Sequence, residues 1–216
     1  MEHAFGLDIP QTLDEVCDPQ RLALIVYDMQ VGVVGQLPDG AEVTRRVAAV
    51  LQTARAAGTR TFFTRHMWLP PEVAGVAQLR TALAWQQVDH VADLTPALLR
   101  DSPGFQIMPE LAPRPSEAVF DKITMSAFVG TPLDIALRDC GIVAFAIVGV
   151  ALEIGIEPTV RHATDLGYIP VVVTDACGSR DQAAAARSLA GLAFAGGSLQ
   201  TDSATLATAL GRRRDA

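Results

Sequence analysis

The chain has 216 residues, of which 50% are hydrophobic and 19% are charged, with a formal net charge of −7 and a pI near 5.0. This length and composition favour one folded domain over residues 1–216 and exclude a disordered chain. The acidic balance argues against partners that are nucleic acids or anionic membranes, because both repel an acidic protein.

The first half of the chain alternates apolar strands with a helical segment. Residues 1–20 form a polar N-terminal extension with little periodicity, which we expect to wrap the surface or reach a partner subunit. A buried strand over 21–27 ends at Asp28, and a second strand covers 59–64. Between them, apolar residues at helical spacing predict a helix over 42–57 that ends at Gly58.

Residues 66–115 break this pattern. The segment is rich in Pro, Trp and Gln, and it predicts one helix near 76–87 within a long excursion. Loops of this length in compact domains are usually functional, so we expect the excursion to contribute to a site.

The second half returns to alternating strands and helices, which predict a three-layer α/β/α domain with a mostly parallel sheet and right-handed crossovers. The central strand, over 143–148, is apolar on both faces, as in a strand buried between two helical layers. A tight turn over 149–159 follows it, with Pro158 in the first turn of the next helix. The other predicted strands are 118–121 and 169–174, and the other predicted helices are 132–140, 183–195 and 206–210.

Polar residues follow the strands at the edge where open α/β sheets bind ligands. Asp28 follows the first strand, Lys122 follows the third, and the turn at Gly149 follows the central strand. Each residue alone is typical of a turn cap or a solvated charge. Together, at equivalent positions of a parallel sheet, they predict a site in which a carboxylate, an ammonium and backbone N–H groups converge.

Three motifs resemble the isochorismatase-like hydrolases, also called the cysteine hydrolase superfamily. These are Asp28-Met29-Gln30 after an apolar strand, Lys122 with Ser126-Ala127-Phe128, and the segment GVALEIGIEPTVRHATDLGY. The resemblance implies a Rossmann-like α/β/α sandwich with a six-stranded, mostly parallel sheet. It also implies a homo-oligomer, a dimer or a tetramer, with sites near the subunit contacts.

The amidases of that superfamily use an Asp–Lys–Cys triad. By resemblance, Asp28 and Lys122 are the catalytic acid and lysine, but the nucleophile position is Gly155, so the covalent thioester route is closed. The family also implies a cis peptide at Val150-Ala151, which would aim the backbone N–H groups of Ala151 and Leu152 at a substrate oxygen.

A glycine at the nucleophile position resembles the isochorismatase-type members. We therefore expect Asp28 to deliver or remove a proton, Lys122 to orient it, and Gly155 to leave room for water or a bulkier substrate. Two alternatives stay open: an amidase inactivated by Cys-to-Gly replacement, acting otherwise on amide or urea C–N bonds, and a ligand-binding homologue without catalysis.

Several residues are candidates for binding a small-molecule substrate. His66 ends the second strand, Glu153 lies in the turn, and Arg80 in the excursion could bind a carboxylate. No Asp-x-His spacing indicates a metal, so we expect neither a metal nor another cofactor. The full set of predicted substrate-binding residues is His66, Trp68, Gln78, Arg80, Phe128 and Glu153.

The three cysteines, Cys17, Cys140 and Cys177, are widely spaced and form no CxxC motif, so neither a disulfide framework nor a zinc site is indicated. Cys177, in a predicted turn after the 169–174 strand, is a secondary candidate nucleophile. The N-terminus lacks a basic, apolar leader and the chain lacks a membrane span, which predicts a cytoplasmic protein.

Overall fold

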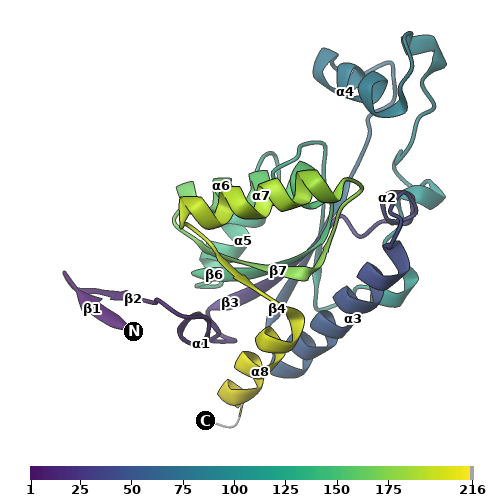
Figure 1. Cartoon of the computed structure of the whole chain (residues 1–216). Coiled ribbons are helices and arrows are strands. Elements are labelled where there is room, and N and C mark those ends of the chain that lie inside the picture. The colour runs from purple at the N-terminus through teal and green to yellow at the C-terminus, as the bar shows by residue number, and fades with distance from the viewer. Residues whose placement is uncertain (215–216) are drawn as a thin grey trace.

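A six-stranded sheet forms the middle of the molecule (Figure 1). Its strands are in the order β5-β4-β3-β6-β7-β8, and each pair of neighbouring strands runs parallel. The computed structural model describes residues 1–214. The strands are β1 (Glu2–Ala4), β2 (Leu7–Ile9), β3 (Leu22–Tyr27), β4 (Arg60–His66), β5 (Ala118–Lys122), β6 (Ala144–Val150), β7 (Ile169–Gly178) and β8 (Leu199–Thr201).

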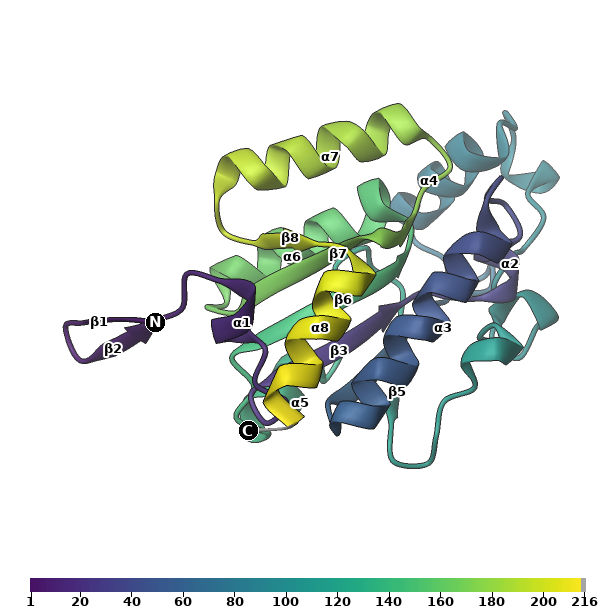
Figure 2. The ribbon, with the colours of Figure 1, turned by 60° about the horizontal axis from the view of Figure 1, so that its bottom comes forward.

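Helices cover both faces of this sheet, with α3 and α8 on one side and α6 and α7 on the other (Figures 1 and 2). The α-helices are α1 (Leu13–Val16), α2 (Val31–Val34), α3 (Gly40–Ala57), α4 (Val76–Gln86), α5 (Leu133–Asp139), α6 (Glu157–Asp165), α7 (Gln182–Ala195) and α8 (Ser203–Arg214). The 3-10 helices are η1 (Val91–Asp93), η2 (Pro103–Phe105) and η3 (Pro109–Leu111), and η4 (Leu152–Ile156) is a π-helix. The predicted α/β/α sandwich is confirmed.

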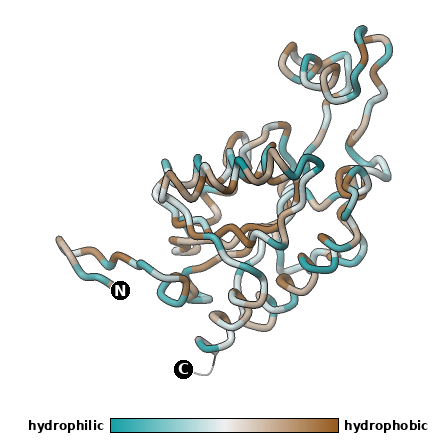
Figure 3. Tube along the Cα trace, viewed as in Figure 1, coloured by the Kyte–Doolittle hydropathy of each residue, from teal (hydrophilic) through white to brown (hydrophobic). Residues whose placement is uncertain are grey.

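The alternation of side chains along β3 divides the core into two layers. Every residue of β3 is buried, and successive residues belong to different clusters. Leu22, Leu24 and Val26 pack with α3 and α8, whereas Ala23, Ile25 and Tyr27 pack with α5, α6 and α7. Figure 3 shows the hydrophobic segments gathered in the sheet between these layers.

Several predicted boundaries need correction. Residues 1–20 form a hairpin, β1-β2, and the short helix α1, where little structure was expected. The turn after β6 is itself helical, because η4 begins at Leu152 and continues directly into α6. Strand β7 extends to Gly178 rather than ending near Thr174, because its second half pairs again with the end of β6 after an irregularity.

Residues 67–100, called the arm below, stand away from the sheet and carry α4 (Figure 1). The return segment after the arm is attached to the body by a buried ion pair, in which Arg55 Nε lies 2.7 Å from Glu117 Oε1. Within residues 1–214, no helix is both long enough and apolar enough to cross a bilayer.

Candidate functional site

The carboxyl ends of β3, β4 and β5 bring the predicted charged pair together. Lys122 Nζ lies 2.6 Å from Asp28 Oδ2, and the two side chains are 0% and 6% exposed. Lys122 is two strands from Asp28 in the sheet order, ~10 Å by strand spacing, so a long side chain is needed to reach it. The expected meeting of Asp28 and Lys122 at one edge is therefore observed.

Asp28 is held as an acceptor at both of its carboxylate oxygens. Thr64 Oγ1 donates to Oδ1 at 2.6 Å, and the Lys122 ammonium donates to Oδ2. Its backbone φ is +46°, in the left-handed region, which turns the chain sharply as it leaves β3. Two donors on one carboxyl group fit the ionised form, which accepts hydrogen bonds and donates none.

Lys122 has an acceptor for each of its three N–H bonds. Besides Asp28, its Nζ donates to the Tyr27 hydroxyl at 2.8 Å and to the Thr124 carbonyl at 3.0 Å. Burial lowers the pKa of Lys122, while the neighbouring carboxylate of Asp28 opposes that shift.

Tyr27 is part of the site and was not predicted from the sequence. It is 1% exposed, and its hydroxyl accepts from Lys122 and donates to the Met125 carbonyl. Burial, and next the charge of Asp28, raise the pKa of Tyr27 well above its usual value, so it is a neutral phenol. A tyrosine that ends a run of aliphatic residues directly before Asp28 is the signal that could have identified it.

The turn after β6 carries the expected backbone geometry. The peptide bond between Val150 and Ala151 is cis, as the resemblance implied. Ala151 and Leu152 stand at the start of η4, where helical N–H groups have no partner within the helix. Gly149 lies beside Tyr27 in the register of β3 and β6, with a φ of +126°, and a Cβ there would fall 2.9 Å from the Tyr27 nitrogen.

Gln30 fixes the segment that follows Asp28. Its Oε1 accepts from the His66 N–H at 2.7 Å, and its Nε2 donates to the carbonyls of His66 and Phe105 at 3.0 and 2.9 Å. A fully buried amide with all these bonds ties β3, β4 and the η2 segment into one support for the charged pair.

A cavity of about 400 Å³ opens over this support, a volume within the range of small-molecule sites. Tyr27, Asp28, Ala151, Glu153 and Gly155 line it on the body, and Trp68 and Trp85 line it from the arm. Lys122 does not line the cavity; it lies behind Asp28 and Tyr27. We call Tyr27, Asp28, Lys122 and Gly155 the site floor.

Two polar side chains on the cavity wall are suited to contact a ligand. His66 lines the cavity, as expected, and burial lowers its pKa to about 4, which makes it a neutral imidazole at pH 7. Oxygen Oε2 of Glu153 is buried and has no hydrogen-bond partner within residues 1–214. A buried carboxylate oxygen without a partner is costly, so a ligand donor would complete it.

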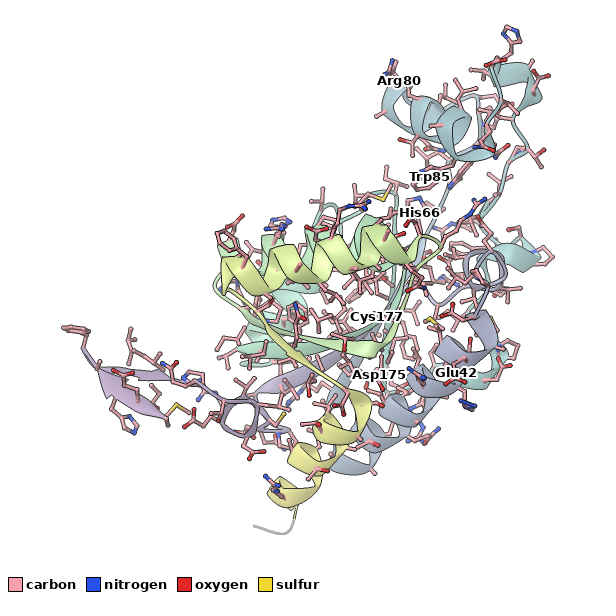
Figure 4. The ribbon with its side chains drawn as sticks, in the orientation of Figure 1. Glu42, His66, Arg80, Trp85, Asp175 and Cys177 are labelled. Atoms are coloured by element: carbon pink, nitrogen blue, oxygen red, sulfur yellow. The ribbon has the colours of Figure 1, made fainter. Side chains whose placement is uncertain are left out.

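The structure does not bring three of the predicted substrate-binding residues to this cavity. The Gln78 side chain hydrogen-bonds the backbone of Leu69 and lines a separate hollow of the arm. Arg80 is exposed on α4 and points away from His66 and Trp85 (Figure 4). Phe128 is core, stacked on Tyr168 at 5.7 Å between ring centroids.

The remaining cysteine candidate is also unsuited. Cys177 lies within β7 rather than in a turn, and its Sγ contacts the Ile147 carbonyl at 3.7 Å (Figure 4). Burial raises the pKa of the Cys177 thiol to about 12, so almost none is thiolate at pH 7. In the described part of the chain, no cluster of three or more His, Cys, Asp or Glu is arranged to hold a metal ion.

Comparison with known proteins identifies relatives of this chain. A family model for the isochorismatase domain matches residues 22–204. A cysteine hydrolase from Pseudomonas syringae pv. phaseolicola 1448A has a TM-score of 0.79 and 23% identity, covering 92% of this chain and 96% of its own, a likeness of fold.

Two further structures are more similar in sequence. An isochorismatase family protein from Burkholderia thailandensis is 28% identical with a TM-score of 0.71, over 89% of this chain and 96% of its own. One from Desulfovibrio vulgaris subsp. vulgaris str. Hildenborough is 25% identical with a TM-score of 0.74, over 89% of this chain and 99% of its own.

Proposed function

The chain belongs to the isochorismatase family of hydrolases, and from this premise we propose that it hydrolyses a small molecule without a covalent enzyme intermediate. The observation that carries the proposal is Asp28, which faces the cavity as a carboxylate while position 155 provides no thiol. Thr64 and Lys122 hold that carboxylate in place, and Glu153 and His66 stand on the wall around it.

In this mechanism Asp28 acts first as a base. A proton moves from water to Asp28, the water oxygen bonds to the electrophilic carbon of the substrate, and the bond to the leaving group breaks. The same proton then moves from Asp28 to the leaving atom. General-base assistance of this kind supplies about 10²- to 10⁴-fold, so positioning in the cavity must supply the rest.

The backbone at Ala151 and Leu152 is suited to the charge that develops on the substrate. N–H groups at the start of η4 would donate to that oxygen, and the helix terminus favours negative charge. Glu153 Oε2 would accept from a hydroxyl or N–H group of the substrate, which favours a substrate with a donor near the reacting carbon.

The competing interpretation is a binding protein without turnover. The buried ion pair of Asp28 and Lys122, whose carboxylate faces the cavity, counts against it, because replacement of such a pair by apolar residues is often neutral or stabilising. A site with no chemistry to perform has no need of the pair.

The test is a substrate panel of esters, amides, ureas and enol ethers, assayed in H₂¹⁸O with the native chain, Asp28→Asn and Arg80→Ala. We expect one ¹⁸O atom per turnover, in the product that contains the attacked carbon, a loss of about 10²-fold or more in Asp28→Asn, and native rates in Arg80→Ala. Rapid quenching and intact-mass measurement should detect no covalent adduct. Turnover retained in Asp28→Asn, or ligand binding in the cavity without turnover across the panel, would overturn the proposal.

A homo-oligomer, a dimer or a tetramer, and a cytoplasmic location stay predictions. Exposed apolar side chains on the N-terminal hairpin and on the arm support self-association; they are Phe5, Leu7, Val73, Val76, Trp85 and Val91. Light scattering after size-exclusion chromatography would give the mass directly, and a monomer at micromolar concentration would contradict the prediction.

A further inference from the structure

Gly155 borders the cavity, but the space that a side chain would occupy there is not empty. A Cβ on Gly155 would lie 2.5 Å from both Cε1 and Cζ of Tyr27 and closer still to the hydroxyl oxygen. Carbon atoms in contact are normally 3.5–4.0 Å apart. We expected Gly155 to leave room for water or a bulkier substrate. That expectation is wrong, because Tyr27 occupies the space beside Gly155.

Tyr27 cannot easily move aside. The ring is fully buried in the core cluster beneath α6, and the hydroxyl is held from two directions by Lys122 and Met125. The Lys122 ammonium also lies 4.3 Å from the centre of the ring, a cation–π distance. Rotation of the ring would break these contacts together.

We infer that Tyr27 and Gly155 form a coupled pair, in which the phenol occupies the space of the missing side chain and Tyr27 becomes the positioning residue for Lys122. The inference deepens the proposed hydrolysis and rests on it for the role of the hydroxyl, whereas the packing stands by itself. In this pair a neutral phenol lies between Lys122 and the cavity. Unlike a thiolate, a neutral phenol does not attack a substrate carbon.

This pairing bears on the alternative of an amidase inactivated by Cys-to-Gly replacement. A cysteine replaced by glycine in an otherwise unchanged site would leave a void where the sulfur had been. Here no void is left, because Tyr27 of β3 fills the space beside Gly155 of η4, so the site is arranged as a whole for thiol-free chemistry. Restoring a cysteine at position 155 alone should not restore a nucleophile.

A double-mutant cycle on stability tests the packing without any substrate. Gly155→Ala should lower the unfolding equilibrium midpoint in urea, equivalent to roughly a 10- to 100-fold loss in the folding constant. Tyr27→Val combined with Gly155→Ala should cost less than the sum of the two single changes. Tyr27→Phe with Gly155→Ala should give less relief, because the hydroxyl oxygen is removed but the ring carbons Cε1 and Cζ remain 2.5 Å from the added Cβ.

Gly211→Ala is the matched control, since a Cβ at this position of α8 meets no atom within 4 Å. We expect it to be neutral or slightly stabilising. If Gly155→Ala in the Tyr27 background is as stable as Gly211→Ala, or if the cycle is additive, the coupled pair is refuted.

A thiol at position 155 gives a second measurement that does not depend on how far Gly155→Ala folds. Gly155→Cys and Tyr27→Val/Gly155→Cys are treated with iodoacetamide, and peptide mapping separates residue 155 from Cys17, Cys140 and Cys177. We expect alkylation at least about tenfold faster in the double variant, where the cavity reaches the sulfur. Equal rates in two folded variants would show that Tyr27 does not block the position.

The positioning role is tested by Tyr27→Phe, which keeps the ring and removes one acceptor from the Lys122 ammonium. The pKa of Lys122, which also faces Asp28 and His66, should fall, because a hydrogen bond to the charged form is lost. The alkaline limb of the pH–rate profile should move to lower pH. If Tyr27→Phe is active and the alkaline limb of its pH–rate profile does not move, Tyr27 only packs against its neighbours and the positioning role is refuted. The proposed hydrolysis would not be affected by that result.

Discussion

The site floor and the arm form opposite walls of one cavity, yet they are built in contrasting ways. The floor is buried and its polar groups are paired, with Lys122 donating to three acceptors and Asp28 accepting at both oxygens. The arm has a small hydrophobic cluster of its own, made of Trp68, Ala82 and Leu98, and much of α4 is exposed. The floor is therefore fixed by buried polar contacts, whereas the arm offers exposed side chains at the cavity wall.

This contrast assigns different tasks to residues that line the same cavity. A change in the floor removes a partner from a buried charge, so it should reduce stability and chemistry together. A change on the exposed part of the arm removes ligand contacts and little else. Substitutions in the floor should therefore lower stability, whereas substitutions on the exposed part of the arm should weaken ligand binding without lowering stability.

The largest effect is expected from Lys122→Met, which leaves the Asp28 carboxylate buried without a cation. We expect a loss of about 3–5 kcal/mol in the free energy of unfolding, measured by urea denaturation at pH 7. The double variant Asp28→Asn/Lys122→Met is the control and should regain much of the loss. A loss of less than about 1 kcal/mol in the free energy of unfolding for Lys122→Met alone would show that the charged groups of the floor are not strongly coupled.

The next effect is the pH dependence that His66 imparts. Its pKa is about 4 in the folded state and about 6.5 when unfolded, so the unfolded chain binds the proton more readily. Stability from this residue is present above pH 6.5 and is lost as the pH falls from 6.5 through 4, by up to about 3 kcal/mol.

Chemical denaturation at a series of pH values tests this. His66→Gln should flatten the part of the stability curve between pH 6.5 and 4, while the native chain and Arg80→Ala should both show the decline. Identical slopes in the native and His66→Gln proteins would mean that the imidazole is not held neutral against the floor.

A smaller effect, confined to binding, is expected from Trp85→Ala. Trp85 lines the cavity but is 41% exposed, so its removal should weaken binding of a cavity ligand by about tenfold and change stability by less than about 0.5 kcal/mol. Calorimetric binding and thermal unfolding measure the two separately. A large stability loss would show that the arm is as firmly packed as the floor.

The smallest effect is expected from Glu153→Gln. The amide keeps the shape and one acceptor oxygen but removes the charge, so a ligand with a donor should bind a few-fold more weakly, in line with about 0.5–1.5 kcal/mol for one hydrogen bond. A ligand analogue methylated at that donor should bind both proteins equally. An unchanged affinity for the donor-bearing ligand would place its donor elsewhere.

Much of the fold followed from patterns along the chain. The apolar run before Asp28, the β-rich run before Arg65 and the helical spacing that stops at Gly58 predicted β3, β4 and α3 closely, because buried strands and helix ends depend on residues near in sequence. The short strand β8 and the second half of β7 were missed, since three residues carry little periodicity and β7 continues only because β6 lies beside it.

The site divides in the same way. Asp28, Lys122 and His66 could be expected at one edge, because they end parallel strands and the edge is common to all of them. Arg80 and Phe128 could not be placed, because the direction of an exposed helix and the depth of an aromatic ring depend on how distant segments pack.

The chain by itself indicated that a carboxylate and an ammonium would stand at one edge of a parallel sheet, because Asp28 and Lys122 each come at the end of an apolar strand. Only the tertiary structure decided that Tyr27 fills the space beside Gly155. Tyr27 meets Gly155 because β3 and η4 are pressed together in a close-packed core, where one missing side chain is compensated by a neighbour that no local pattern identifies.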